Sequence, residues 1–141
     1  MNNLGIPNRG DAAAVAAISE VIFGYCHSID AFSDEGVLDL FMQDGEWWQP
    51  GTEPLRGRAQ IAGFLGARDR AIPRRHLASN VVIDVEGPEQ AKVVSYFTVF
   101  KAGPDGAPTP ISMGEYRDTF RLDEGRWRIA RRETHRVFRA N

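Results

Sequence analysis

The chain has 141 residues, of which 43% are apolar and 26% are charged, a composition typical of one folded globular domain rather than a disordered segment. The formal net charge of −2 argues against an overall attraction to nucleic acid or to anionic membranes. A single cysteine, Cys26, excludes an intrachain disulfide and favours a reducing compartment, so we expect a cytoplasmic protein.

The polar, Gly- and Pro-containing residues 1–10 predict a flexible N-terminus without a signal peptide, followed by a single domain over residues 11–141. No stretch approaches the roughly 18 consecutive apolar residues expected of a membrane span. Asp11 can cap a first helix running to about Phe32, because apolar residues recur every three or four positions on one face. Ser33 can cap a second, short helix with an acidic first turn.

The middle of the chain predicts short elements. Asp44 and Gly45 indicate a turn, residues 46–49 with their two tryptophans a strand, and residues 50–56 a loop. A third helix is predicted over residues 57–70.

From Arg75 onward the apolar period changes from 3.6 to 2. This predicts four strands, over residues 76–85, 91–101, 111–122 and 126–138. Their connections are short enough for antiparallel hairpins. Helices segregated from such a meander indicate an α+β fold, in which a strongly twisted sheet wraps around the helices and leaves a cone with an open mouth. Such concavities commonly become ligand pockets.

Alternation along the strands predicts which side chains face the cone. His76 shares a face with Asn80, and Tyr116 and Asp118 face inward because their neighbours are plainly polar. By the same alternation Arg131 faces inward. It can then pair with Asp118, which is the favoured structural interpretation, or hold an acidic ligand.

Asp30 near the end of the first helix and His76 at the start of a strand form the strongest candidate for chemistry. A carboxylate on one imidazole nitrogen fixes the tautomer and raises the basicity of the ring. Two plain alternatives remain open: His76 can bond to a backbone carbonyl, and Asp30 can pair with Arg74 or Arg75. The three histidines have no His-x-His or His-x3-His spacing, so no metal site is expected.

Six short motifs follow one another along the chain: Tyr25-x4-Asp30, Phe41-x2-Asp44-Gly45, Leu55-Arg56-Gly57, His76-x3-Asn80, Gly114-x-Tyr116-x-Asp118-x-Phe120, and Gly125-x-Trp127-x-Ile129 before Arg131-Arg132. Their order and spacing resemble the SnoaL-like branch of the NTF2-like superfamily, over about residues 12–136. The resemblance implies an α+β cone-shaped barrel with three N-terminal helices packed on a strongly curved antiparallel sheet.

In the subgroup that includes scytalone dehydratase, bile-acid 7α-dehydratase and hexachlorocyclohexane dehydrochlorinase, a helix Asp and a strand His form a catalytic dyad. Asp30 and His76 match these positions. The chain departs from the dehydrochlorinase in having no lysine before Lys92, and from scytalone dehydratase in having Tyr96, not histidine, in the later strand region. The resemblance therefore implies the dyad but neither substrate.

These features predict a cofactor-independent lyase or isomerase acting on a small, largely apolar carbonyl or polyol metabolite. His76 removes the proton, Asp30 orients the ring, and hydroxyl or amide donors stabilise the developing oxyanion. The candidate catalytic residues are His76, Asp30 and Tyr25. The candidate substrate-binding residues are Asn80, Tyr96, Tyr116, Trp48 and Arg131, with Trp47 and Trp48 on opposite faces and only one of them in the cavity.

Two other functions remain open: a non-catalytic small-molecule binding protein on the same fold, and a protein-interaction or assembly module. The seven arginines between residues 121 and 139 indicate a solvated or interface face rather than a nucleic-acid site. A wide outer sheet face usually needs covering, so self-association as a dimer or trimer is expected.

Overall fold

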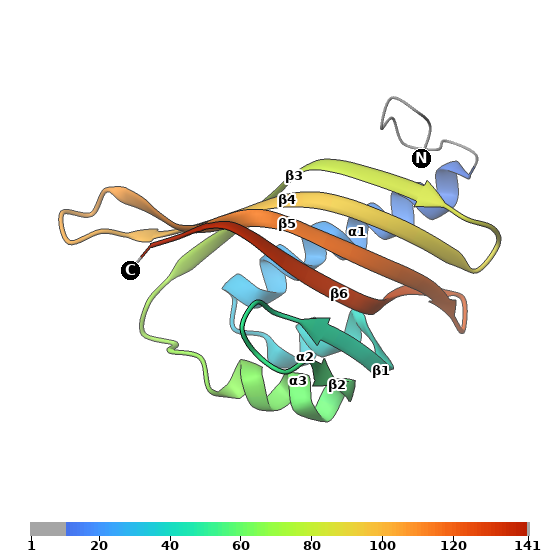
Figure 1. The fold of residues 1–141 in the computed structure, drawn as a ribbon, viewed down its shortest axis with the longest axis horizontal. Helices are drawn as coiled ribbons and strands as arrows, with labels where there is room; N and C mark the ends of the chain where they lie inside the picture. Colours follow the sequence, from blue (N-terminus) through green and yellow to red (C-terminus); the bar gives the residue numbers. More distant parts are fainter. Residues whose placement is uncertain (1–10, 141) are drawn as a thin grey trace.

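The computed structural model describes residues 11–140, and the expected flexible segment over residues 1–10 lies outside them. The helices come first, and the long strands follow (Figure 1). The helices are α1 (Ala12–Asp30), α2 (Asp34–Asp39) and α3 (Gly57–Gly66). The strands are β1 (Phe41–Trp48), β2 (Leu55–Arg56), β3 (Arg74–Val85), β4 (Gln90–Ala102), β5 (Pro108–Asp123) and β6 (Arg126–Arg139).

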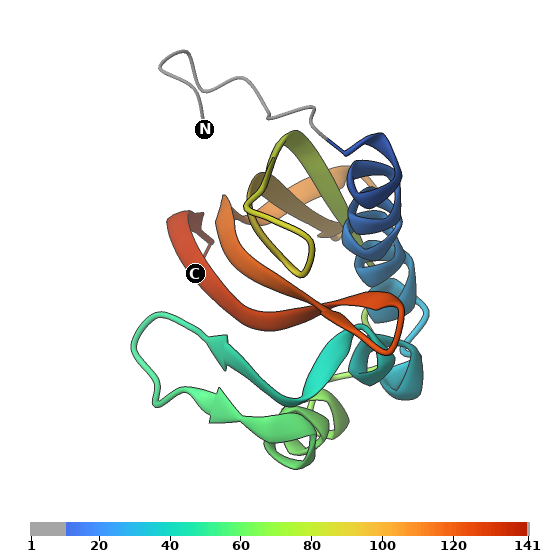
Figure 2. The same cartoon turned by 90° about the vertical axis from the view of Figure 1, so that its right-hand side faces the viewer.

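Helix α1 is the core helix. The Asp11 carboxylate caps it by accepting the backbone N–H groups of Ala13 and Ala14, both at 3.1 Å. One apolar stripe is buried against the sheet, as the periodicity predicts, and Figure 2 shows α1 lying along one face of the sheet. By length and by its mean hydropathy of 1.5, α1 is also apolar enough to cross a membrane, which the sequence analysis did not anticipate. Its stripe packs instead as a core helix of a folded domain does.

The six strands form one curved sheet in the order β2-β1-β6-β5-β4-β3. Strands β3 to β6 pair as an antiparallel meander, as predicted, whereas β1 pairs with β6 in parallel. The order does not return from β3 to β2, so the sheet stays unclosed. The helices cover its concave side, which makes the domain α+β (Figure 2).

Three local predictions in the first half were wrong. The predicted turn at Asp44 and Gly45 lies inside β1, where the register with β6 shifts. Gly45 is required there by close packing, since a Cβ would lie 2.9 Å from the Met42 carbonyl oxygen. The predicted loop contains the short strand β2, which pairs with β1. Helix α3 ends at Gly66 rather than at residue 70.

Single extra residues interrupt the alternation of β3 and β6 and decide which side chains face the cone. In β3, residues 80 and 81 together oppose one residue of β4. In β6, Ala130 is the extra residue against β5, and Val137 is a second one nearer the C-terminal end. Each such bulge reverses the face of every side chain beyond it.

Candidate active site

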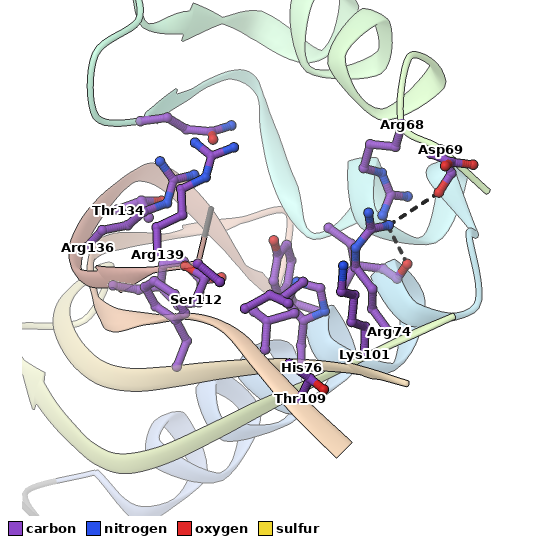
Figure 3. Close-up of a pocket in the computed structure, with 18 of the residues that line it drawn as sticks. Arg68, Asp69, Arg74, His76, Lys101, Thr109, Ser112, Thr134, Arg136 and Arg139 are labelled. Atoms are coloured by element: carbon purple, nitrogen blue, oxygen red, sulfur yellow. Dashed lines mark hydrogen bonds between the residues drawn. The ribbon is translucent and has the colours of Figure 1, made fainter. Parts of the chain in front are cut away.

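A cavity of about 730 Å³ lies inside the cone. Its apolar wall comes from α1, α3, β1 and β4, through Ile29, Phe64, Trp47, Phe97 and Val99. His76 lines the cavity from β3, and Figure 3 shows it between two groups of polar and basic side chains. A concave site that combines an apolar wall with placed polar groups is the usual form of a small-molecule site.

Asp30 and His76 are in contact at the cavity wall. Oδ1 of Asp30 lies 2.6 Å from Nδ1 of His76, and Oδ2 accepts the His76 backbone N–H at 2.8 Å. The carboxylate therefore holds both the ring and the backbone of the same residue. Because an ionised carboxylate can only accept a hydrogen bond, Nδ1 carries the hydrogen and the neutral ring keeps its lone pair on Nε2. Within residues 11–140, no hydrogen bond occupies that nitrogen.

The two side chains are nearly buried, with 13% of the His76 side chain and 11% of the Asp30 side chain exposed. Asp30 sits in the last turn of α1, and His76 is the third residue of β3, so the contact ties the two elements together. Neither nearby arginine takes the carboxylate. Arg74 donates to the backbone carbonyl of Asp69, and Arg75 donates to that of Arg74.

Tyr25 lies in the buried stripe of α1, five residues before Asp30, and its ring meets the ring of His76 edge-on at a centroid distance of 6.3 Å. It meets Tyr116 in the same way at 5.9 Å. Both tyrosines are buried and line the cavity. Burial raises the pKa of Tyr25 to about 12, although Arg132 and the Tyr116 hydroxyl act in the opposite direction. Burial also raises the pKa of Tyr116, so both phenols keep their protons near neutral pH and can donate hydrogen bonds.

The buried partner of Asp118 is Arg132, so the predicted partner Arg131 was wrong. Arg132 donates to both carboxylate oxygens, at 2.9 and 2.8 Å, and both side chains are 0% exposed. Burial alone lowers the pKa of Arg132, but the Asp118 carboxylate outweighs it and raises the pKa. The bulge at Ala130 causes the change of partner, because it turns Arg132 inward and Arg131 outward.

Arg131 therefore does not reach the cavity. Its guanidinium stacks on Trp48 at 4.3 Å, on the opposite side of the sheet from the helices, and pairs with Glu133. Trp48 was also wrong as a cavity residue. Its indole N–H donates to Glu46 at 2.7 Å, whereas Trp47 is the tryptophan that lines the cavity and donates to Thr134 at 3.0 Å.

Tyr96 and Asn80 were wrong as cavity residues as well. Tyr96 is 49% exposed, because Ser95, not Tyr96, lies opposite Tyr116 in the β4–β5 register. Asn80 is exposed at the β3 bulge, with a φ of +50° that asparagine tolerates better than most residues. Beyond this bulge, Ile83 takes the cone-facing position.

The cavity also has a polar and basic lining that was not predicted from the sequence, which includes Arg68, Arg74, Lys101, Ser112, Arg136 and Arg139. The arginine-rich stretch near the C-terminus was the available signal, but it was interpreted as a solvated or interface face. Within residues 11–140, no cluster of three or more His, Cys, Asp or Glu side chains is arranged to hold a metal ion.

Comparison with known proteins agrees with this architecture. A SnoaL-like domain profile matches residues 10–133. No curated protein matches the chain significantly. Among solved structures, a Novosphingobium aromaticivorans protein that bears the provisional name scytalone dehydratase is 26% identical, with a TM-score of 0.80, and the match covers 92% of this chain and 87% of that one.

Two other solved structures are also 26% identical to this chain. An NTF2-like protein with a cystatin-like fold from the same organism has a TM-score of 0.81 and 92% coverage of both chains. A Catenulispora acidiphila protein in complex with S-DNPA has a TM-score of 0.77, and the match covers 88% of this chain and 95% of that one. The chain belongs to the SnoaL-like domain family and has the NTF2-like fold.

Proposed function

We propose that the protein is a cofactor-independent lyase or isomerase in which His76 removes a proton from a carbon atom beside a carbonyl group. The observation that carries the proposal is the Asp30–His76 contact at the wall of the cavity. A neutral imidazole oriented through Nδ1 presents Nε2 to a ligand as a base. A positioned base of this kind contributes about 10²–10⁴-fold to a rate.

The neighbouring side chains fit the rest of such a reaction. When the C–H bond breaks, the proton goes to Nε2 of His76 and the electron pair passes into the carbonyl as an enolate. The Asp30 carboxylate then stabilises the imidazolium. Tyr25 and Tyr116 keep their protons, since burial raises the pKa of both, and can donate to the enolate oxygen.

Two outcomes complete the proton balance. In an isomerisation, the imidazolium returns its proton to another carbon of the same conjugated system. In a dehydration, the enolate expels a β-hydroxyl group, which leaves as water after taking the proton. Both fit a small, largely apolar carbonyl or polyol metabolite, because the wall around His76 contains Ile29, Phe97 and Val99.

The test measures uptake of solvent deuterium by enolisable bicyclic ketones such as 2-tetralone, and loss of water from their β-hydroxy derivatives. We expect exchange above the buffer rate with the unchanged protein, and a fall of about 10²–10⁴-fold in His76→Gln. His27→Gln is the matched control, because His27 is exposed on α1, and it should keep the rate. Exchange that survives in His76→Gln would contradict the proposal.

The second candidate function is a binding protein that uses the same cavity without chemistry. The Catenulispora acidiphila structure in complex with S-DNPA supports ligand binding by a relative. Tight binding of the ketones, without any protein-dependent exchange, would favour this candidate over the lyase or isomerase.

We also propose that copies of the chain associate through the outer face of the sheet, as a dimer or trimer. Leu77, Tyr96 and Met113 are large, exposed side chains on the neighbouring strands β3, β4 and β5. The register places Thr98 between Leu77 and Met113, so these side chains lie in adjacent rows. Light scattering measures the mass in solution. A monomer at all concentrations would contradict self-association.

A further inference from the structure

The charged side chains that line the cavity are mostly basic. Five are basic and one, Asp69, is acidic, in a chain whose net charge is −2. The basic residues are Arg68, Arg74, Lys101, Arg136 and Arg139. Figure 3 shows them in two groups on either side of His76, with Arg136 and Arg139 beside Ser112 and Thr134 on one side. A concave surface lined by one sign of charge attracts ligands of the other sign.

The group near α3 is largely engaged within the protein. Arg68 donates to the backbone carbonyls of Leu65 and Ile29 and lies 3.5 Å from the Asp34 carboxylate. Arg74 donates to the backbone carbonyl of Asp69 at 3.2 Å. These guanidinium groups hold the turn after α3 and the start of β3 in place.

The pair on β6 is different. Within residues 11–140, no carboxylate lies at ion-pair distance from Arg136 or Arg139. Burial, and then the neighbouring charge of Arg139, lowers the pKa of Arg136. Two like charges held close together without a counter-charge are unfavourable, and an anion between them removes the repulsion.

Two hydroxyl groups beside this pair have unused hydrogen-bonding capacity. The Oγ atom of Ser112 is buried and has no hydrogen-bond partner among the described residues. The Oγ1 atom of Thr134 accepts the indole N–H of Trp47, which leaves its own hydrogen free to donate. Both side chains line the cavity. A buried hydroxyl without a partner is rare and suggests a missing ligand.

The bulge at Val137 explains why Arg136 and Arg139 face the same side of the sheet. Arg136 and Arg139 are three residues apart and would face opposite sides of a regular strand. Val137 is the extra residue against β5 and points out of the sheet, 81% exposed, so both arginines face the cavity.

We propose that Arg136 and Arg139, together with Ser112 and Thr134, bind an anionic group of the ligand, a carboxylate or a phosphate, at this side of the cavity. Arginine pairs with both groups through two parallel hydrogen bonds, and hydroxyl donors complete the set. The ligand is then an apolar acid or phosphate ester rather than a neutral compound. That its other end reacts at His76 rests on the proposed function, whereas the anion site does not.

The experiment compares the binding of 2-naphthoate, 2-naphthyl phosphate, neutral 2-naphthamide and inorganic phosphate by calorimetry. We expect at least one aromatic anion to bind about tenfold or more tightly than the amide, and this preference to weaken as salt is added. A tighter naphthoate indicates a carboxylate ligand, and a tighter naphthyl phosphate indicates a phosphate ester. Equal binding of anions and amide, or no binding of any anion, would overturn the proposal.

The double variant Arg136→Gln/Arg139→Gln should lose the preference for the anion. Arg121→Gln is the matched control, because Arg121 is exposed near the other end of β5, and it should keep the preference. Circular dichroism checks that each variant folds, and Arg136→Lys/Arg139→Lys, which keeps the charge, should keep part of the preference. A preference that persists in the double glutamine variant would overturn the assignment of these residues.

His76→Gln separates the two proposals. If the variant keeps the anion preference but the unchanged protein shows no deuterium exchange, the anion site stands and the proposed reaction fails. If exchange depends on His76 but anions bind no better than the amide, the reaction stands and the anion site fails.

Discussion

Asp118–Arg132 and Asp30–His76 are two carboxylate pairs on the helix side of the same sheet, and they differ in what each leaves free. Both side chains of the first pair are 0% exposed, and Arg132 donates a hydrogen bond to each carboxylate oxygen of Asp118. The second lies at a cavity wall, and Asp30 occupies only one of the two ring nitrogens of His76. We call Asp118–Arg132 the closed pair and Asp30–His76 the open pair. A closed pair can only stabilise the fold, whereas an open pair has a ring nitrogen that is able to act on a ligand.

The surroundings reinforce this difference. The Arg132 guanidinium lies between two rings, 4.0 Å from the ring centroid of Tyr116 and 4.3 Å from that of Tyr25. Both rings take the place of water around the buried cation. Around His76, by contrast, the cavity wall includes the apolar side chains of Phe97 and Val99. The same kind of contact is therefore closed to a ligand in the first pair and open to one in the second.

The largest expected effect comes from breaking the closed pair. Arg132→Met leaves the buried Asp118 carboxylate without a partner, so we expect the free energy of unfolding to fall by about 3–5 kcal/mol. Urea denaturation measures it. Arg131→Met is the matched control, because the neighbouring Arg131 lies on the outer face, and it should cost no more than about 1 kcal/mol.

A second variant tests the cause of that loss. Replacing both partners, as in Asp118→Leu/Arg132→Met, removes the unpaired charge and should recover much of the stability. A double variant as unstable as Arg132→Met alone would mean that stacking on Tyr25 and Tyr116, not charge pairing, is the main contribution of Arg132.

Breaking the open pair should change activity more than stability. Asp30→Asn keeps the size of the side chain and an acceptor for the His76 backbone N–H, but its amide can donate to Nδ1 and so favour the tautomer with the proton on Nε2. We expect exchange to fall by about 10²–10⁴-fold and the free energy of unfolding by about 1 kcal/mol.

Imidazole ¹⁵N shifts measured by NMR report the tautomer of His76 directly, and they separate a positioning role of Asp30 from a merely structural one. An unchanged tautomer in Asp30→Asn together with full activity would show that Asp30 only ties α1 to β3. His27, exposed on α1, provides an internal reference in the same spectra.

The sequence predicted the long elements well because their signals are local and repeated. The caps at Asp11 and Ser33 and the apolar stripe of α1 are enough to place the first two helices. A period of two over more than ten residues places each of the strands β3 to β6. The approach of Asp30 to His76 was not visible in the spacing and followed only from the family resemblance.

The errors in the site have one main physical origin. Bulges at Asn80, Ala130 and Val137 each add one residue, and one added residue is enough to exchange the inner and outer faces. Arg131 was therefore chosen over Arg132, and Arg136 stayed among the arginines interpreted as a solvated or interface face. Gly114 is a visible signal near the Val137 bulge, because a Cβ there would clash with the His135 carbonyl oxygen. Nothing comparable marks Ala130.

The smallest effect concerns Tyr25, which joins the two pairs through its contacts with Arg132 and His76. An unfolded tyrosine loses its proton near pH 10, but Tyr25 in the fold keeps it to about pH 12. The unfolded chain therefore releases a proton first as the pH rises, and the free energy of unfolding falls between these two pH values, by at most about 3 kcal/mol. Tyr25→Phe should reduce this alkaline loss, whereas Tyr96→Phe should not, because Tyr96 is exposed. Urea denaturation at increasing pH measures how steeply the free energy of unfolding falls with pH. Equal slopes in the two variants would mean that the Tyr25 hydroxyl is more open to water than its burial implies.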